Sequence, residues 1–393
     1  MRNITLTPSP LWLLREPDSD SILIVMRTGT HAVAPRPLAR TLATLVLATA
    51  VALSASGCGA RARVSRWTES RSLLGTAVSM TLWGEDERAL AEAADTAFAA
   101  MREVEDALDP YAPDSQVAAI NEAPYAPHEL PREATEILRR IEALGVDEYF
   151  SPTLWGVTRL YDFGGEGLVP DDVLLAASVE AARNAEFAGD YTGIVFDPAE
   201  GGPASNPGID LSGASKGLAL DRAVWVLKES PGVDAALISA GSSTAILGAK
   251  PDGEAWRVGI EDPRDVGSVI AVISVEATAG TVAAISTSGD YQQFFEKAGV
   301  RYHHILDPST GRPAGGVRSM TVALVAGTAD SLAQTDADIL STALFVAGVE
   351  NAANAAERLR VALYAVDDEG RVHMTPAPAQ SPIDIESLRE PTR

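Results

Sequence analysis

Three polar clusters in the second half of the chain carry side chains that could bind or transfer a phosphate-containing group. The first is Asp210-Leu-Ser-Gly-Ala-Ser-Lys-Gly217, at the start of an expected helix. Free N–H groups at a helix N-terminus, together with Lys216, suit a phosphate, and Ser212 or Ser215 can cap such a helix. The alternative is a plain helix cap beside a solvated lysine, and this cluster alone favours that alternative.

The second cluster is His303-His-Ile-Leu-Asp-Pro-Ser-Thr-Gly311, which follows Ser286-Thr-Ser-Gly-Asp-Tyr291. Neighbouring residues of a strand face opposite sides, so one histidine of the pair can enter a pocket while the other faces away. A histidine such as His304, with the Asp307 carboxylate three residues on, can act as a general base with an orienting partner. Asp-Pro-Ser-Thr-Gly is also strong turn chemistry, and both interpretations can hold together.

The third cluster is Thr335-Asp-Ala-Asp-Ile-Leu-Ser-Thr-Ala343. Asp338, Ser341 and Thr342 are spaced i, i+3 and i+4, which places them on one face of a helix. One carboxylate and two hydroxyls form a hard-oxygen group suited to magnesium. The alternative is an acidic helix start that complements the helix dipole, and this cluster alone favours it.

Charge and composition limit the partners of these clusters. The chain has 393 residues and a formal net charge of −23, which repels nucleic acid and requires a metal or a local positive site for any anionic substrate. Cys58 is the only cysteine, so the chain forms neither an intrachain disulfide nor a cysteine-based zinc site. The sequence contains neither a P-loop nor a Rossmann fingerprint, so another device must hold any dinucleotide pyrophosphate.

The N-terminal region resembles an export signal. Arg36 and Arg40 precede the uncharged, apolar stretch 41–57, and the small residues Ala55-Ser-Gly57 stand directly before Cys58. This order predicts a signal segment over 1–57, with a true start at Met26, and a bacterial lipobox whose Cys58 receives a lipid. A retained membrane anchor is the alternative, but a stretch of 17 residues is shorter than the ~20 that cross a bilayer.

The rest of the chain must supply the elements that position the three clusters. Helical spacing of Leu90, Ala94, Ala97, Met101, Val104 and Leu108 predicts a helix over 85–108. Further helices are expected over 133–143, 216–227 and 338–347, and 155–208 is expected to hold short elements only. Strands are expected over 74–83, 235–240, 255–261, 268–274, 283–287 and 318–326. Their irregular alternation indicates an α+β fold rather than a doubly wound sheet. Residues 58–68 are expected to be a linker, and 376–393 a flexible tail.

Eight segments in this order resemble the FAD:protein FMN transferase family, the ApbE-like flavin transferases. The resemblance extends from about Ser70 to Arg358. The matching stretches are Leu-Gly-Thr (74–76), Tyr-Ala-Pro-Asp-Ser (111–115) with Ile120-Asn121, Phe-Ser-Pro-Thr (150–153), Asp-Leu-Ser-Gly-Ala-Ser-Lys-Gly (210–217), Trp-Arg-Val-Gly-Ile (256–260), Ser-Thr-Ser-Gly-Asp-Tyr (286–291), His-Ile-Leu-Asp-Pro (304–308) and Asp-Ile-Leu-Ser-Thr-Ala (338–343).

The resemblance implies an α+β fold of two related α/β subdomains with mainly antiparallel sheets and an FAD cleft between them, over a transferase domain at 69–375. It implies a metal site, a base and a flavin site. The metal ligands would be Asp338, Ser341, Thr342 and the carbonyl of Gly213, and the base would be His304 with Asp307 beside it. The implied FAD contacts are Leu74, Tyr111, Tyr149, Phe150, Ser151, Asp210, Lys216 and Leu306.

The implied reaction is Mg²⁺-dependent transfer of FMN from FAD to a Ser or Thr hydroxyl of a target flavoprotein, with release of AMP. The target would be a subunit of a membrane electron-transfer system, and the lipid anchor would keep the enzyme near it. Two other functions use the same residues: an FAD pyrophosphatase, which uses water as acceptor, and a non-catalytic flavin-binding lipoprotein.

Two departures from the family pattern concern the flavin site. Ser151 stands where the family commonly has an acidic residue, and Gly241-Ser242-Ser243 stands where it often has Gly-Gly-Asp. Neither departure is expected to touch the metal face.

Overall fold

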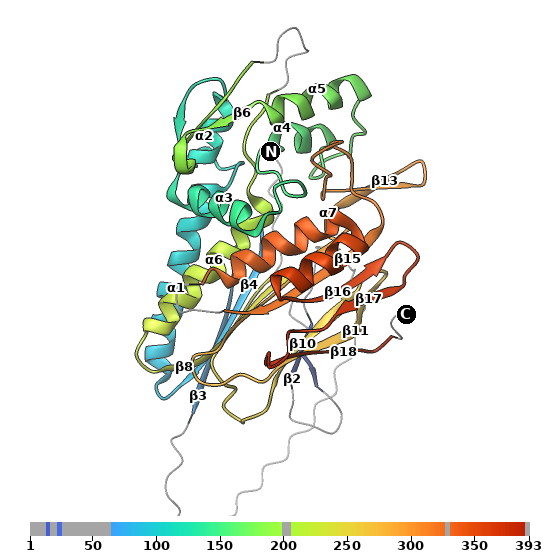
Figure 1. Cartoon of the computed structure of the whole chain (residues 1–393). Helices are drawn as coiled ribbons and strands as arrows, with labels where there is room; N and C mark the ends of the chain where they lie inside the picture. The colour runs from blue at the N-terminus through green and yellow to red at the C-terminus, as the bar shows by residue number, and fades with distance from the viewer. Residues whose placement is uncertain (1–12, 16–21, 26–63, 199–205, 327–330, 390–393) are drawn as a thin grey trace, which may run out of the picture.

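The computed structural model describes residues 13–15, 22–25, 64–198, 206–326 and 331–389 (Figure 1). An eight-stranded sheet, antiparallel throughout, forms the middle layer. Its strands, in spatial order, are β17 (Val372–Thr375), β16 (Ala362–Asp367), β15 (Val317–Val325), β12 (Val282–Gly289), β9 (Ser243–Leu247), β8 (Val233–Ala240), β4 (Thr76–Gly84) and β3 (Ser65–Leu73).

Three long helices cover one face of this sheet: α1 (Glu87–Leu108), α6 (Ser212–Glu229) and α7 (Ala333–Leu359). Side chains of a strand alternate between the two faces, and β8 follows this rule. Ala236 and Ile238 belong to the apolar cluster that includes the helices, whereas Ala235 and Leu237 belong to a second cluster on the opposite face. Because both faces of the sheet are buried in apolar clusters, its strands carry apolar side chains on both sides.

A second sheet covers the opposite face. Its strands, in spatial order, are β1 (Leu13–Arg15), β2 (Ile22–Val25), β10 (Trp256–Asp262), β11 (Asp265–Val275) and β18 (Ile383–Ser387). The pairing of β2 with β10 is parallel, and the other pairings are antiparallel. Trp256, Val258 and Ile273 pack from this sheet into the second apolar cluster.

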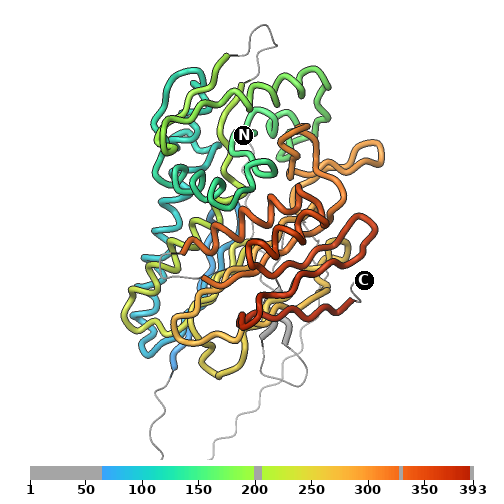
Figure 2. The backbone as a smooth tube through the Cα atoms, in the orientation of Figure 1, coloured from blue at the N-terminus to red at the C-terminus, as the bar shows by residue number. Residues whose placement is uncertain are grey.

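A smaller part lies at one end of the layers, above α6 and α7 in the view of Figure 2. Its apolar residues Val117, Ile137 and Phe196 join the cluster of the long helices, so the two parts share a core. Its elements are α2 (Gln116–Glu122), β5 (His128–Glu129), α3 (Arg132–Leu144), α4 (Trp155–Thr158), η1 (Arg159–Tyr161), α5 (Asp172–Arg183), β6 (Ala185–Phe187), η2 (Gly189–Tyr191) and β7 (Gly193–Phe196). A separate hairpin of β13 (Phe294–Lys297) and β14 (Val300–His303) follows β12 along the chain.

The α+β class with mainly antiparallel sheets is confirmed. Each helix and strand expected from periodicity has a counterpart in the structure. The predicted helix over 85–108 is α1, capped by the Asp86 side chain, which accepts from the Ala89 N–H at 2.9 Å. All six of its predicted core residues are buried.

The structure differs from the sequence-based expectations in four segments. The 12-residue helix α5 lies in a stretch where only short elements were expected, and β3 begins inside the expected linker. The expected short helix over 338–347 is part of α7, which extends to Leu359 across a break at Gly348. The expected flexible tail contains β18, because five of its residues pair with β11 and Ile383 is buried in the second cluster.

Among the described residues, α7 is the one helix that is long and apolar enough to cross a membrane by length and composition. Its apolar residues Ile339, Leu340 and Leu344 are buried in the main cluster against the sheet. This burial makes α7 a core helix. The expected signal segment and Cys58 lie outside the described residues, apart from the short strands β1 and β2.

Candidate functional site

The starts of α6 and α7 are joined by two buried carboxylates. Asp221 of α6 accepts hydrogen bonds from the main-chain N–H groups of Gln334 and Thr335 at 3.1 and 2.9 Å, and from the Thr335 hydroxyl at 2.7 Å. Burial raises the pKa of Asp221 to about 7, and the Thr335 and Gln334 donors oppose that rise. In the other direction, Asp338 of α7 accepts from the Gly217 N–H at 3.0 Å. The two helices therefore hold each other in register.

Gly213, in the first turn of α6, lies beside Thr342 of α7. A Cβ at Gly213 would be 3.7 Å from Thr342 Oγ1, and 3.1 Å from the ring of Phe150. The structure thus brings together three residues that the sequence analysis assigned to the metal and flavin sites. The face of α7 that carries Thr342 therefore lies against the first turn of α6, which carries Gly213, as the predicted metal site requires.

The Asp338 carboxylate is 3% exposed and is surrounded by donors. Its Oδ1 accepts from Ser286 Oγ at 2.9 Å and from Ser243 Oγ at 3.2 Å, and Lys216 Nζ lies 3.7 Å from its Oδ2. The expectation that the Gly241-Ser242-Ser243 departure does not touch the metal face is wrong, because the tight turn before β9 points Ser243 at Asp338.

A row of hydroxyls continues from Asp338 along the contact between β12 and α7. Ser288 Oγ lies 3.0 Å from both Ser341 Oγ and Thr342 Oγ1. Ser341 is fully buried, whereas Thr342 is partly exposed. The result is an oxygen-rich wall with one accessible end.

The donor set at this wall fits a hard divalent cation. Among the described residues, no three His, Cys, Asp or Glu side chains gather closely enough to hold a metal ion. A cation here would depend on Asp338, the hydroxyls of Ser341 and Thr342, and the Gly213 carbonyl. Magnesium prefers such oxygen ligands and tolerates few carboxylates because it keeps several waters.

His304 is oriented by the main chain of the neighbouring hairpin. Its Nδ1 lies 3.2 Å from the carbonyl oxygen of Gln293, which can only accept, so Nδ1 carries the proton and Nε2 is the basic nitrogen. Burial, followed by the neighbouring His303, lowers the pKa of His304 to about 4, and the charge of Lys216 contributes to the lowering. His304 is therefore a neutral base at physiological pH, close to Lys216.

Asp307 is not the orienting partner of His304. Its carboxylate accepts from the main-chain N–H and the hydroxyl of Ser309, both at 2.7 Å, and its main chain closes the turn to Gly311. The Asp-Pro-Ser-Thr-Gly stretch thus forms the turn that its composition predicts. The predicted pairing with His304 is wrong because the short turn uses the carboxylate locally.

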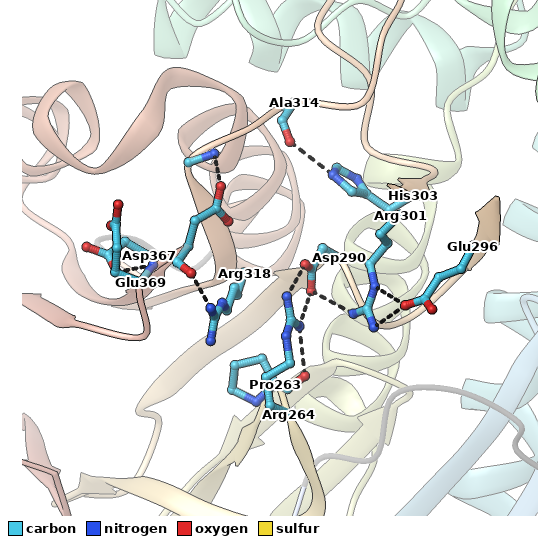
Figure 3. A network of polar contacts seen from close by, with 12 residues as sticks. Pro263, Arg264, Asp290, Glu296, Arg301, His303, Ala314, Arg318, Asp367 and Glu369 are labelled. Atoms are coloured by element: carbon cyan, nitrogen blue, oxygen red, sulfur yellow. Dashed lines mark hydrogen bonds and ion pairs between the residues drawn. The ribbon is translucent and has the colours of Figure 1, made fainter. Parts of the chain in front are cut away.

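His303 is the last residue of β14, and it has other partners than His304, which lies just outside the strand. His303 Nε2 donates to the Ala314 carbonyl at 2.9 Å (Figure 3). Its ring meets the Phe345 ring edge-on, with the centroids 5.6 Å apart. Burial lowers the pKa of His303. A cavity of about 400 Å³ is lined in part by His303, Arg264 and Asp290.

The Arg264–Asp290 pair shown in Figure 3 anchors the chain directly after β12. Asp290 accepts from Arg264 Nη1 at 2.7 Å and Nη2 at 2.5 Å, and Arg301 of β14 lies 3.7 Å away. A two-pronged arginine–carboxylate pair of this kind fixes geometry as well as charge. Because Arg264 stands in the turn between β10 and β11, the pair joins that turn to the end of β12, and Arg301 brings the hairpin flanked by Gln293 and His304 to the same carboxylate.

Three predicted flavin contacts are accessible or strained. Leu74 occupies the tight β3–β4 turn at φ +55°, a conformation that a leucine rarely adopts, and its N–H donates to Glu105 Oε1 at 2.5 Å. Tyr111 is 72% exposed and meets Trp155 edge-on at 5.0 Å. Asp210 lies just before α6, and its Oδ1 accepts from the Ser212 N–H at 3.0 Å. The expected capping by Ser212 or Ser215 is wrong, because Leu211 is at the cap position and makes no side-chain cap hydrogen bond.

The other predicted flavin contacts differ in accessibility. Tyr149 and Ser151 are partly exposed on either side of buried Phe150, and Ser151 Oγ lies 3.0 Å from Thr153 Oγ1. The Leu306 side chain is buried in a small apolar cluster with Val157, Tyr161, Leu175 and Val179.

Sequence reasoning missed five residues that shape the site: Gly217, Ser243, Ser286, Ser288 and Gln293. Gly217, Ser286 and Ser288 lie inside stretches that match the family but received no role. Ser286 and Ser288 are two residues apart on a strand, so they share a face, and this spacing could have identified them. Gln293 acts through its carbonyl, for which the sequence carries no signal.

Comparison with known proteins identifies the family of the chain. The chain matches the model of the ApbE family over residues 74–365. It is 32% identical over 314 residues to the FAD:protein FMN transferase of Treponema pallidum, covering 75% of this chain and 82% of the relative. It is 32% identical over 283 residues to that of Vibrio cholerae, covering 69% and 78%.

Solved structures give the same relation. The ApbE protein of Thermotoga maritima has a TM-score of 0.67 and 28% identity, covering 79% of this chain and 97% of its own. The flavinyl transferase ApbE of Pseudomonas stutzeri has a TM-score of 0.63 and 27% identity, covering 80% and 95%. The chain therefore belongs to the ApbE family, together with these FAD:protein FMN transferases.

Proposed function

We propose that this chain is a Mg²⁺-dependent FAD:protein FMN transferase. A Ser or Thr hydroxyl of a target flavoprotein attacks the FMN-side phosphorus of FAD. The bond from that phosphorus to the bridging oxygen breaks, AMP leaves with that oxygen, and the hydroxyl proton is taken up by a base. The product carries FMN in a phosphoester.

The observation that supports this proposal most is the convergence of Asp338, Thr342 and Gly213 beside Lys216 and His304. The oxygen donors suit a cation, the lysine suits a phosphate, and the imidazole offers Nε2 as a base. Family membership supports the same set of roles.

Separate residues of the chain would hold the metal, bind the phosphates and accept the proton. Asp338, Thr342, Ser341 and the Gly213 carbonyl would hold Mg²⁺, which neutralises phosphate charge and supports the leaving AMP. Lys216 and the first turn of α6 would bind pyrophosphate oxygens in a strongly acidic protein. His304 Nε2 would accept the hydroxyl proton, with Nδ1 held by Gln293. The flavin would lie among Leu74, Tyr111, Tyr149, Phe150, Ser151, Asp210 and Leu306.

The cellular place of the enzyme is also a proposal. The apolar stretch before Cys58 supports export and a lipid on that cysteine, which would hold the enzyme at the outer face of the cytoplasmic membrane or in the periplasm. The target would then be a subunit of a membrane electron-transfer system. Intact-mass analysis of the cell product tests this: a lipid-modified N-terminus at Cys58 is expected, and an unmodified chain that retains 1–57 would overturn it.

Incubation with FAD, Mg²⁺ and a Ser/Thr acceptor protein tests the activity. The acceptor is expected to gain one FMN less one water, with one AMP released for each FMN attached. FMN and AMP released at the same rate with and without acceptor would identify a hydrolase. FAD that stays intact throughout would identify a binding protein.

A further inference from the structure

Ser288 contacts two residues of the oxygen-rich wall, Ser341 and Thr342, from a different element. It lies on β12, and its Oγ is 3.0 Å from both Ser341 Oγ and Thr342 Oγ1 of α7. Ser288 is 8% exposed and Ser341 is fully buried, so bulk water does not compete for these bonds. A hydroxyl has one proton to donate, and this count fixes the direction of each bond in the row.

The Asp338 end of the row sets the direction. A carboxylate and a carbonyl only accept. Ser286 donates its proton to Asp338 Oδ1 at 2.9 Å. Ser341 Oγ donates to the main-chain oxygen of Asp338 at 3.0 Å and shares this one proton with the longer 3.3 Å contact to Ser286 Oγ, whose own proton is already given to Asp338. Ser341 therefore has no proton left for Ser288 and accepts from it.

The direction then passes along the row to Thr342. Ser288 gives its proton to Ser341, so the 3.0 Å contact between Ser288 and Thr342 needs Thr342 as the donor. The order of donation is Thr342 to Ser288, Ser288 to Ser341, and Ser341 to the Asp338 carbonyl. The Thr342 proton points into the protein, and its lone pairs are left for the side on which Gly213 lies.

A hydroxyl binds a cation through a lone pair, with its proton directed elsewhere. We propose that Ser288 is a positioning residue for the metal site: it takes the Thr342 proton and so presents the lone pairs of Thr342 to the cation. This inference rests on the proposed Mg²⁺ site and extends it to a residue that contacts no ligand itself. Without Ser288, the Thr342 hydroxyl rotates freely and must be ordered each time a cation binds.

Titration of the FAD-loaded protein with Mn²⁺, without acceptor and followed by electron paramagnetic resonance, tests the inference by affinity rather than by activity. Ser288→Ala is expected to raise the Kd for Mn²⁺ about 10–100-fold, the usual effect of removing an outer-shell partner. Ser288→Thr keeps the hydroxyl and is expected to restore most of the affinity.

Thr287→Val is the matched control, because Thr287 is the neighbouring residue of β12 and faces the other side. Its hydroxyl lies 2.9 Å from Thr321 Oγ1, so the variant also loses one buried hydrogen bond. Its Mn²⁺ affinity is expected to equal that of the unmodified protein. An equal loss of affinity in Thr287→Val would overturn the inference in favour of a general loosening of β12.

A double-mutant cycle gives the sharpest outcome. If Ser288 acts through Thr342, adding Ser288→Ala to Thr342→Val changes the Kd no further. Additive losses, or an unchanged Kd in Ser288→Ala while Asp338→Asn abolishes binding, would overturn the role of Ser288 alone. No Mn²⁺ binding by the unmodified protein would instead remove the proposed metal site.

Discussion

At the scale of single residues, Asp338 determines whether the oxygen wall can hold a cation. It is the one carboxylate of the donor set, and it also accepts from Gly217, Ser243 and Ser286. Its structural role and its proposed role as a metal ligand can be measured separately in a variant that keeps the shape of the side chain but removes the charge.

Asp338→Asn is expected to lower FMN transfer by more than about 100-fold and to abolish Mn²⁺ binding, since a neutral amide is a poor ligand for a hard cation. The amide nitrogen also faces a donor, so the free energy of unfolding falls by about 1–3 kcal/mol. Transfer assays and urea unfolding measure the two effects. Transfer at the unmodified rate in this variant would remove Asp338 from the metal site.

His304→Ala is expected to lower FMN transfer by about 10²–10⁴-fold while FAD affinity stays within a few-fold, because a base acts in the reaction rather than in binding. Equal losses of transfer and FAD binding would make His304 a binding residue. Single-turnover transfer and equilibrium FAD titration measure the two quantities.

The pKa of His304 makes a separate prediction. It is lowered from an ordinary 6.5 to about 4, so the base is neutral throughout the neutral range, and transfer is expected to fall with acid only as pH approaches 4. Because the unfolded state binds the proton first, His304 lowers stability as pH falls from 6.5 towards 4. The urea midpoint of His304→Ala should therefore depend less on pH over this interval. A transfer rate that halves near pH 6.5 would contradict the assignment.

The residues of the proposed site were predictable where a role is assigned to the side chain itself. Asp338, Thr342 and His304 stand out by type and spacing, and the structure brings the first two together with Gly213. Gln293 was not predictable, because it acts through a main-chain carbonyl. The partner of Asp307 was predicted wrongly, because Ser309, two residues along in the same turn, donates two hydrogen bonds to the Asp307 carboxylate.

At the scale of elements, the site depends on how closely α6 and α7 approach. Gly217 lies at the crossing, where a Cβ would be 2.4 Å from the Gln334 carbonyl and 2.7 Å from Thr335 Cα. Both neighbours are main-chain atoms of the α7 start, which Asp221 caps. Neither can move without breaking that cap.

Gly217→Ala is therefore expected to separate the helices, to lower the free energy of unfolding by about 1–3 kcal/mol, and to weaken Mn²⁺ binding at the same time. Gly164→Ala is the control, since nothing lies within 4 Å of its Cβ position. Urea unfolding and metal titration of both variants are the measurements. A Gly217→Ala protein as stable and as metal-binding as the control would show that the crossing does not set the site.

Elements with a strong apolar period were predictable, and those without one were not. The stripe from Leu90 to Leu108 identified α1, and the buried strand β8 was read from its apolar run. In contrast, β3 is an edge strand with an exposed residue at every second position and charged side chains, so its sequence lacks an apolar period. The start of α6 was placed too late because its first turn is made of small polar residues.

At the scale of the whole molecule, the C-terminal segment completes a layer rather than fraying. Proline-rich composition after Thr375 suggested a loose end, but β18 pairs with β11 as a strand of the second sheet, and its Ile383 and Ile385 pack in the second apolar cluster. Local composition could not reveal this pairing, because the partner strand β11 lies more than a hundred residues earlier.

Deletion of 376–393 is expected to lower the free energy of unfolding by about 2–4 kcal/mol, the contribution of one to two buried aliphatic side chains, and to expose the edge of β11 to self-association. Deletion of 390–393 alone, which removes none of the described contacts, is the control. Urea unfolding and light scattering measure the two effects. Equal stability of both truncated proteins would show that residues 376–389 do not stabilise the fold.

The central claim is that a cation held by Asp338, Thr342 and Gly213 allows the chain to move FMN from FAD to a protein hydroxyl. Intact-mass measurement of a Ser/Thr acceptor after incubation with FAD and Mg²⁺ tests it most directly, with Asp338→Asn and a metal chelator in parallel. The account predicts one added FMN per acceptor with the unmodified protein, and none in either parallel reaction. FMN addition that persists with Asp338→Asn or with the chelator would contradict it.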